Sequence, residues 1–392
     1  MTEWVERKIS DIGTVVGGAT PSTKKPENYE DGEIAWITPK DLSTFSGRYI
    51  ERGERNITEI GLKSCSTQLL PPNTVLFSSR APIGYVAIAA NEVCTNQGFK
   101  SVIPNENTDP LFLFYLLKYN KDKIEGMGSG TTFKEVSGNT MKNIVVNVPT
   151  DKKVQEKIAA ILGSIDDKIE ENEKINNNLE QQMQALYKSW FIDFEPFNGT
   201  KPSSWQSENI YSIANIIYGA PFASKMFNTD GIGKPIIRIR DLKSQEFVTY
   251  TTEKHPKGHL IKPGDIVVGM DGEFRPYIWG NEEAWLNQRV CIFENKRPKG
   301  KAFLLLTIKP LLNVIEQTQV ATTVIHIGKK DFDAFEIILP DIKTLNQFDE
   351  ITTPMIEQIV NNRLENKRLS FLRDTLLPKL MSGKLDVSDI DL

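Results

Sequence analysis

The sequence is poor in cysteine and histidine, with three residues of each. Cys65, Cys94 and Cys291 are scattered, and neither a CxxC pair nor a histidine at metal-ligand spacing accompanies them. His255 and His259 lie four residues apart, but a proline and a glycine between them indicate a loop instead of a metal-binding helix. We therefore expect reduced, mostly buried thiols, no disulfide framework and no metal site.

Long apolar runs and an excess of one charge are also absent. No stretch approaches the roughly 20 apolar residues of a membrane helix, and the start of the chain lacks the order of a secretory signal. This predicts a cytoplasmic protein that does not contact the membrane. The net charge of −4 lacks the basic excess of a self-sufficient DNA-binding domain. Acidic side chains outnumber basic ones over residues 151–195, so we do not expect that stretch to contact phosphate.

Catalytic motifs are missing as well. The chain has no glycine-rich cofactor loop, no GxxxxGK[ST] phosphate loop and no Asn/Asp-Pro-Pro-aromatic motif for a flipped base. Asp271 and Glu273 lack a lysine at the spacing that a nuclease site would need. We therefore expect no catalytic residue in this chain.

What the sequence does contain is a long-period repeat. A length of 392 residues with 39% apolar and 25% charged content suits at least two folded units. Three segments recur in order, namely 36–42 (WITPKDL) as 236–242 (IIRIRDL), 70–76 (LPPNTVL) as 261–267 (IKPGDIV), and 144–149 (IVVNVP) as 336–340 (EIILP). The chain is therefore interpreted as two tandem copies of one unit.

Each copy combines short strands with one long helix. β-branched runs such as 75–77, 85–88 and 266–268, separated by Pro and Gly turns, predict a strand-rich domain. A proline, Pro149 or Pro340, then precedes a helical stretch. The stretches run over about 152–190 and about 345–377, where Pro354 predicts a kink or a late start.

Apolar residues in both stretches recur at steps of three and four, as in the seam of a helix pair. Aligned seven apart, the seam residues are Ile165, Asn172, Leu179 and Leu186 in the first helix and Met355, Asn362, Leu369 and Leu376 in the second. Asn172 and Asn362 either fix the register from inside the seam or face solvent at its edge. A tandem duplication favours antiparallel pairing about a pseudo-twofold axis.

These elements predict an α+β protein with two strand-rich domains separated by two long helices that form an antiparallel coiled coil. The expected boundaries are 1–150 for the first strand-rich domain, 151–195 for the first long helix, 196–343 for the second strand-rich domain, and 344–392 for the second long helix and tail.

The order of elements and several motifs resemble the specificity subunits of type I restriction-modification enzymes, over nearly the whole chain. The motifs are 17–22 (GGATPS), 158–162 (IAAIL), 165–169 (IDDKI), 186–194 (LYKSWFIDF) and 377–385 (LPKLMSGKL). No single motif is decisive, but together in this order they are specific.

The resemblance implies a non-catalytic DNA-recognition subunit. Each domain would read one half of a split, asymmetric sequence in double-stranded DNA, and the helices would set the spacer. Two methyltransferase subunits, which use S-adenosylmethionine, and two ATP-dependent restriction and translocase subunits would be the partners. This chain itself would bind no cofactor, because S-adenosylmethionine, ATP and Mg²⁺ serve the partner subunits.

Candidate DNA contacts are polar and basic residues in loops beside the strands, because such groups bind phosphates and base edges. They are Thr20, Ser22, Thr23, Lys24, Lys25, Ser79, Arg80, Thr131 and Lys134 in the first copy and Lys225, Arg275 and Thr322 in the second. Arg80 and Arg275 follow matched strands. Asn96-Gln97 recurs as Asn287-Gln288, which favours a shared structural turn, whereas Ser79-Arg80 differs from Met270-Asp271, as readers of different half-sites should.

Two other classes remain. A coiled-coil scaffold whose duplicated domains bind protein fits the acidic helix, and a salt-dependent affinity of the assembled complex for DNA would count against it. A self-contained methylating or cleaving enzyme would need the catalytic loops that the sequence lacks.

Overall fold

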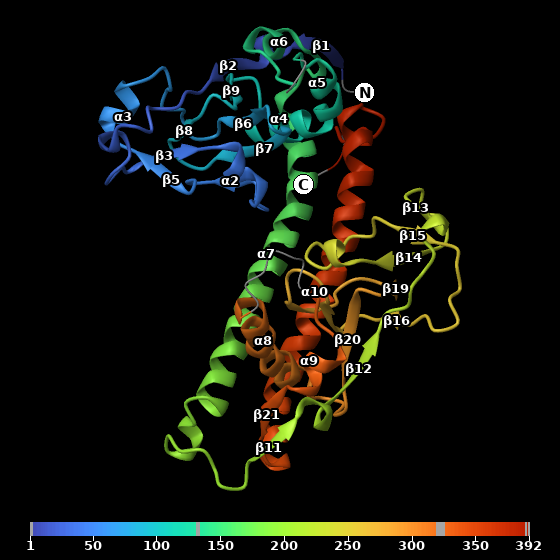
Figure 1. Cartoon of the computed structure of the whole chain (residues 1–392). Helices are drawn as coiled ribbons and strands as arrows, with labels where there is room; N and C mark the ends of the chain where they lie inside the picture. The colour runs from blue at the N-terminus through green and yellow to red at the C-terminus, as the bar shows by residue number, and fades with distance from the viewer. Residues whose placement is uncertain (1–2, 131–133, 319–325, 389, 391–392) are drawn as a thin grey trace. The chain divides into compact units, whose positions relative to one another are not determined.

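In a computed structural model the chain forms small antiparallel and mixed sheets, short helices and two long helices of 40 residues each (Figure 1). The structure describes residues 3–130, 134–318, 326–388 and 390. The chain divides into two compact units, hereafter unit 1 (Met1–Glu170 with Leu369–Leu392) and unit 2 (Glu171–Arg368). Thr131 and Thr322, two of the expected DNA contacts, lie outside the described residues.

Unit 1 contains two main sheets and one separate strand pair. The first sheet has the order β2 (Gly13–Gly17), β9 (Lys100–Pro104), β6 (Val75–Ser79), β7 (Ile83–Ala89) and β4 (Tyr49–Ile50). The second has the order β5 (Arg55–Ile57), β3 (Ile34–Ile37) and β8 (Cys94–Thr95). The pair is β1 (Trp4–Lys8) with β10 (Val145–Pro149).

One buried helix organises the core of unit 1. The short helices are α1 (Ile9–Ile12), η1 (Pro26–Asn28), α2 (Pro39–Ser43), α3 (Glu59–Lys63), α4 (Pro110–Tyr119), α5 (Lys121–Gly126) and α6 (Gly138–Asn143). α4 begins where the Asp109 carboxylate accepts a hydrogen bond of 2.7 Å from the Phe112 amide, with Pro110 at the first helical position. Its residues from Phe112 to Leu117 are all buried, so α4 packs on every side.

Unit 2 repeats this plan. One sheet has the order β12 (Ala214–Tyr218), β20 (Val290–Asn295), β17 (Ile266–Gly269) and β18 (Pro276–Ile278). The other has the order β13 (Phe227–Asn228), β15 (Tyr250–Thr251), β14 (Lys234–Ile237), β19 (Ala284–Leu286) and β16 (Leu260–Ile261), and β11 (Gln206–Asn209) pairs with β21 (Glu336–Leu339). The helices are α8 (Lys301–Thr318), α9 (Lys329–Asp333) and the turns η2 (Glu195–Phe197), η3 (Ile210–Ser212), η4 (Ser224–Met226) and η5 (Ile239–Asp241).

The strand pairings confirm the tandem duplication. The order β2-β9-β6-β7 of unit 1 corresponds to β12-β20-β17-β18 of unit 2. β3 pairs in parallel with β8, and β14 pairs in parallel with β19. Even the isolated bridge between Leu70 and Val93 has a counterpart in the pairing of β16 with β19. Both units are therefore the same α+β domain.

The two long helices are α7 (Lys152–Phe191) and α10 (Ile342–Met381). The expected late start of the second helix at Pro354 was wrong, because α10 begins twelve residues earlier and continues through the proline. Asp341 accounts for the early start, since its carboxylate accepts a hydrogen bond of 3.0 Å from the Thr344 amide. Leu345, Phe348 and Ile356 are buried in the core, and this packing outweighs the backbone hydrogen bond that a proline removes.

Two further expectations concern cysteines and membrane spans. Cys94 and Cys291 are buried, Cys65 is half-buried, and all three are free thiols. Within residues 3–130, 134–318, 326–388 and 390, no helix is both long enough and apolar enough to cross a bilayer.

Candidate nucleic-acid interface

A quartet of asparagines joins α7 and α10 inside unit 2. Asn172 donates hydrogen bonds of 2.7 Å to Glu365 and 2.8 Å to Asn366, and Asn362 donates one of 2.9 Å to Asn176. Asn172 and Asn362 are 1% and 3% exposed, so neither faces solvent. Because residues 172 and 176 of one helix meet 366 and 362 of the other, the helices run antiparallel.

Most of the other seam residues pack on the apolar cores of the two units. Ile165 is 8% exposed in unit 1, where Leu376 packs on the core. Leu179, Leu186 and Met355 pack on the core of unit 2, and Leu369 is half-buried. The spacing of the apolar stripe thus placed these side chains on the inner faces of the helices; their role in fixing the register stays a prediction.

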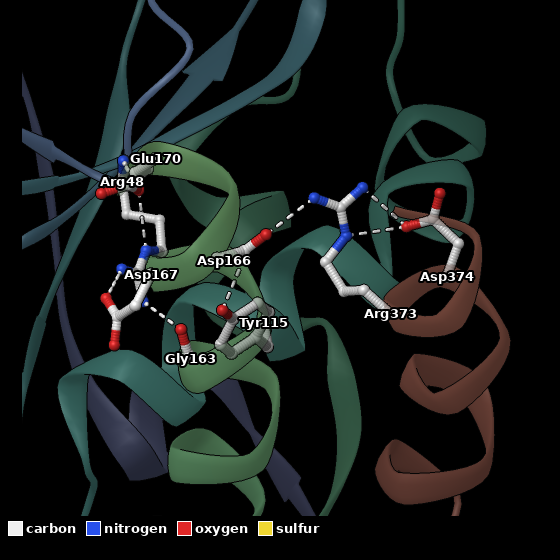
Figure 2. A network of polar contacts seen from close by, with 8 residues as sticks. All are labelled: Arg48, Tyr115, Gly163, Asp166, Asp167, Glu170, Arg373 and Asp374. Carbon is white, nitrogen blue, oxygen red and sulfur yellow. Dashed lines mark hydrogen bonds and ion pairs between the residues drawn. The ribbon is translucent and has the colours of Figure 1, made fainter. Parts of the chain in front are cut away.

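A polar network fastens the sheets of unit 1 to α7 (Figure 2). Arg48 is 7% exposed and donates hydrogen bonds to Asp167, to Glu170 at 3.0 Å and to the Gly163 carbonyl oxygen at 3.2 Å. Burial works to lower the pKa of Arg48, but the hydrogen bonds to Glu170 and Asp167 outweigh it and hold that pKa above its ordinary value. Arg48 therefore stays charged and ties the loop before β4 to the helix.

Asp166 links the same domain to α10 (Figure 2). The Tyr115 hydroxyl donates a hydrogen bond of 2.6 Å to Oδ2 of Asp166, and Arg373 donates one of 2.8 Å to Oδ1. Burial, followed by the charge of Asp166, raises the pKa of Tyr115, which keeps the hydroxyl protonated as a donor. The 165–169 motif (IDDKI) thus supplies acceptors for two neighbouring ion-pair sites, through Asp166 and Asp167.

In unit 2, apolar side chains occupy the places of the triad that Tyr115, Asp166 and Arg373 form in unit 1. The repeat aligns Ile356 with Asp166 and Met183 with Arg373. It also aligns Phe303 with Phe112, so that Leu306 is the counterpart of Tyr115. Leu306, Ile356 and Met183 are 7%, 5% and 1% exposed in one apolar cluster. The two units therefore use different physical interactions at one equivalent place.

Most of the expected DNA contacts in the loop over residues 20–25 of unit 1 are exposed to solvent. Ser22, Thr23, Lys24 and Lys25 are exposed. Thr20 donates its hydroxyl hydrogen to the side chain of Gln97. This bond holds the start of the loop beside the turn that follows β8.

Side chains of opposite charge meet where β6 ends. The Ser79 hydroxyl is buried and donates to the Gly98 carbonyl oxygen at 3.1 Å, so it does not face a ligand. Arg80 is 36% exposed, with Nη1 3.7 Å from the Glu135 carboxylate. Lys134, the neighbour of Glu135, is exposed.

In unit 2 the candidates lie apart from one another in the sequence and on different elements. Lys225 is exposed in η4, and Arg275 is 57% exposed beside Glu273, 3.6 Å away. Arg275 does not occupy the place of Arg80. The residue after β17 in that place is Asp271, which forms a β-bridge with His326 as Arg80 does with Glu135.

The Asn-Gln segments form turns in both units. Oδ1 of Asn96 accepts a hydrogen bond of 2.8 Å from the Gly98 amide, and Oδ1 of Asn287 accepts one of 2.8 Å from the Gln288 amide. Within the part of the chain that the structure describes, no three His, Cys, Asp or Glu side chains gather as a metal site would require.

Comparisons with known proteins agree with this architecture. A family model described as type I restriction modification DNA specificity domain matches residues 1–181 and 202–370. The chain is 34% identical to the type I restriction enzyme MjaIX specificity subunit of Methanocaldococcus jannaschii, over 99% of this chain and 95% of that protein. It is 24% identical to the HindI specificity subunit of Haemophilus influenzae, over 98% and 100%.

A solved structure shares the fold. The S subunit of a type I restriction-modification system from M. genitalium matches with a TM-score of 0.61 at 17% identity, over 97% of this chain and 96% of that one. The chain belongs to the family of type I restriction-modification DNA specificity subunits, as its motifs indicated.

Proposed function

We propose that this chain selects the DNA target of a type I restriction-modification complex by reading two separate half-sites. Residues 1–150 read one half of an asymmetric sequence in double-stranded DNA, and residues 196–343 read the other. The observation that carries the proposal is that both units share one set of strand pairings but present different, partly exposed side chains after the matched strands β6 and β17. A shared frame with different surface chemistry suits a target with two different halves.

The long helices set the distance between the half-sites in this proposal. A helix of 40 residues is roughly 60 Å long at 1.5 Å per residue. B-DNA rises about 3.4 Å per base pair, so that length corresponds to fewer than two turns of the duplex. The asparagine quartet, in which Asn172, Asn176 and Asn362 are buried, supports the proposal because it opposes sliding of one helix along the other.

The chemistry of methylation and cleavage belongs to other subunits of the complex. The helices dock two methyltransferase subunits, which bring S-adenosylmethionine, and through them two restriction and translocase subunits, which use ATP and Mg²⁺. This chain binds no cofactor of its own and works in the cytoplasm, where it meets the chromosome. The sequence supports this division of labour through its lack of cofactor and phosphate loops.

A methylome tests the proposal directly. This chain is co-expressed with its cognate methyltransferase subunit in a host that lacks DNA methylation, and modified adenines are mapped by single-molecule sequencing. The expected result is one split, asymmetric motif with a fixed gap. A soluble, stable complex that methylates no defined motif would contradict the proposal and favour a protein-binding scaffold.

A further inference from the structure

The strand ends after β6 and β17 have the same backbone geometry in the two units. The Ser79 amide donates to the Gly98 carbonyl oxygen at 2.7 Å, and the Met270 amide donates to the Arg289 carbonyl oxygen at 2.9 Å. On the other side, the Val136 amide donates to Ser79 at 3.0 Å, and the Ile327 amide donates to Met270 at 2.9 Å. Arg80 and Asp271, the residues that follow, are therefore equivalent positions.

The charges at these equivalent positions are inverted. In unit 1 the cation Arg80 faces the anion Glu135, and Lys100 approaches the same carboxylate at 3.5 Å. In unit 2 the anion Asp271 faces His326, whose Nδ1 lies 2.6 Å from its Oδ1, and Arg289 approaches Asp271 at 3.5 Å. The backbone is preserved while the side-chain chemistry is reversed.

The ion pair of Arg80 with Glu135 is not needed to hold the strand end of unit 1 in place. Arg80 and Glu135 are 36% and 40% exposed, and the shortest contact within that group is 3.5 Å. Exposed pairs of this kind contribute little to stability. The backbone hydrogen bonds are the same with either charge pattern, so the fold does not explain the choice of side chain.

From this juxtaposition we infer that Arg80 and Asp271 each contact a DNA base, one in each recognition domain. They occupy equivalent positions but prefer different bases. This inference rests on the proposed function and assigns specificity-determining residues to it. The guanidinium of Arg80 donates to O6 and N7 of a guanine in the major groove. The Asp271 carboxylate, oriented by His326 and Arg289, accepts from N4 of a cytosine.

The two substitutions that test the inference change the preferred base without deleting the side chain. Glutamine and asparagine are matched to N6 and N7 of adenine. Arg80→Gln is therefore expected to relax one guanine position of one half-site toward adenine by roughly tenfold. Asp271→Asn is expected to do the same to one cytosine position of the other half-site. Arg52→Gln and Asp230→Asn, exposed residues in the same units, serve as matched controls.

Methylome sequencing of each variant in complex with the methyltransferase subunit gives the readout, and co-purification shows that the complex has formed. The inference is supported when each variant changes one position in one half, the two halves differ, and the controls keep the wild-type motif. An unchanged motif, or methylation that falls uniformly at every site, overturns the inference. The proposal that the two units read separate half-sites would still stand. If the wild-type complex shows no split motif, the proposed function itself fails.

Discussion

Asn362 donates a hydrogen bond of 2.9 Å to Asn176 across α7 and α10. The repeat relates Asn362 to Asn172 and Asn176 to Asn366, and Asn172 donates to Asn366 at 2.8 Å. Each contact is thus the image of the other, which is the relation that a twofold axis imposes on an interface. Within unit 2 the helix pair is therefore pseudo-symmetric about this quartet.

Removing either donor should weaken the helix pair by a similar amount. Asn362→Ala removes the hydrogen bond to the buried Asn176 side chain, and Asn172→Ala removes the equivalent hydrogen bond to Asn366. We expect each variant to lower the free energy of unfolding by about 1–3 kcal/mol, measured by urea unfolding of the full chain with circular dichroism. Lys174→Ala, at an exposed site on α7, is the control. If Asn362→Ala is no less stable than that control, the quartet does not hold the pair together.

Breaking the Asp166 triad should cost more than replacing all of it. Arg373→Met alone leaves the Asp166 carboxylate, 7% exposed, without its cation, and the expected loss of stability is roughly 3 kcal/mol. The triple variant Tyr115→Leu, Asp166→Ile, Arg373→Met reproduces the side chains of unit 2. Since well-packed apolar groups often substitute for a buried ion pair, we expect it to recover most of that loss in thermal unfolding.

The matched control for this series is Asp374→Ala, because Asp374 contacts Arg373 but is 63% exposed. It should change stability by less than about 1 kcal/mol. A triple variant as unstable as Arg373→Met would show that the apolar solution of unit 2 does not fit the frame of unit 1.

Stability should depend on pH through Asp265 of unit 2. Burial raises the pKa of Asp265 above its ordinary value of 3.8, against the hydrogen bond that its carboxylate accepts from the Lys262 amide. The folded state then keeps a proton that the unfolded state loses, so the stabilising contribution is complete below pH 3.8 and is lost as pH rises through the folded pKa.

Asp265→Asn removes this titration and keeps an acceptor for the Lys262 amide. The stability of the variant relative to the wild type is therefore expected to increase between about pH 4 and pH 7, as followed by thermal unfolding. Asp230→Asn, at an exposed site in the same unit, is the control. An equal or decreasing difference for Asp265→Asn would contradict the assigned burial effect.

The repeat and the helix seam could be predicted from the sequence because both are encoded in local sequence patterns. Repeated segments mark equivalent strands wherever they fold, and a stripe at steps of three and four identifies one face of a helix. The second helix was expected to begin near residue 345 and begins at Ile342, whereas the alternative of a late start at Pro354 was wrong because the Asp341 cap and the core packing hold the helix together through the proline. Capping and core packing decided the helix boundary.

The residues that face Arg80 and Asp271 at the strand ends could not be predicted in the same way. Arg80 was identified, but Glu135 lies 55 residues further along the chain and meets it only through a β-bridge. Arg275 was matched to Arg80 by residue type, whereas the backbone pairing of unit 2 puts Asp271 there. The alignment of Ser79-Arg80 with Met270-Asp271 indicates this equivalence, whereas the shared residue type of Arg80 and Arg275 does not. Long-range pairing, which no local pattern encodes, decides which side chains meet.

If the paired helices fix the gap between the two half-sites, lengthening both helices widens that gap. Seven residues inserted into each helix beside the asparagine quartet preserve the seam and add roughly 10 Å, or about three base pairs of DNA. The methylome of the lengthened protein in complex with its methyltransferase subunit should show both half-sites unchanged and the gap widened by that number of base pairs. A motif with both half-sites and the original gap would contradict the claim.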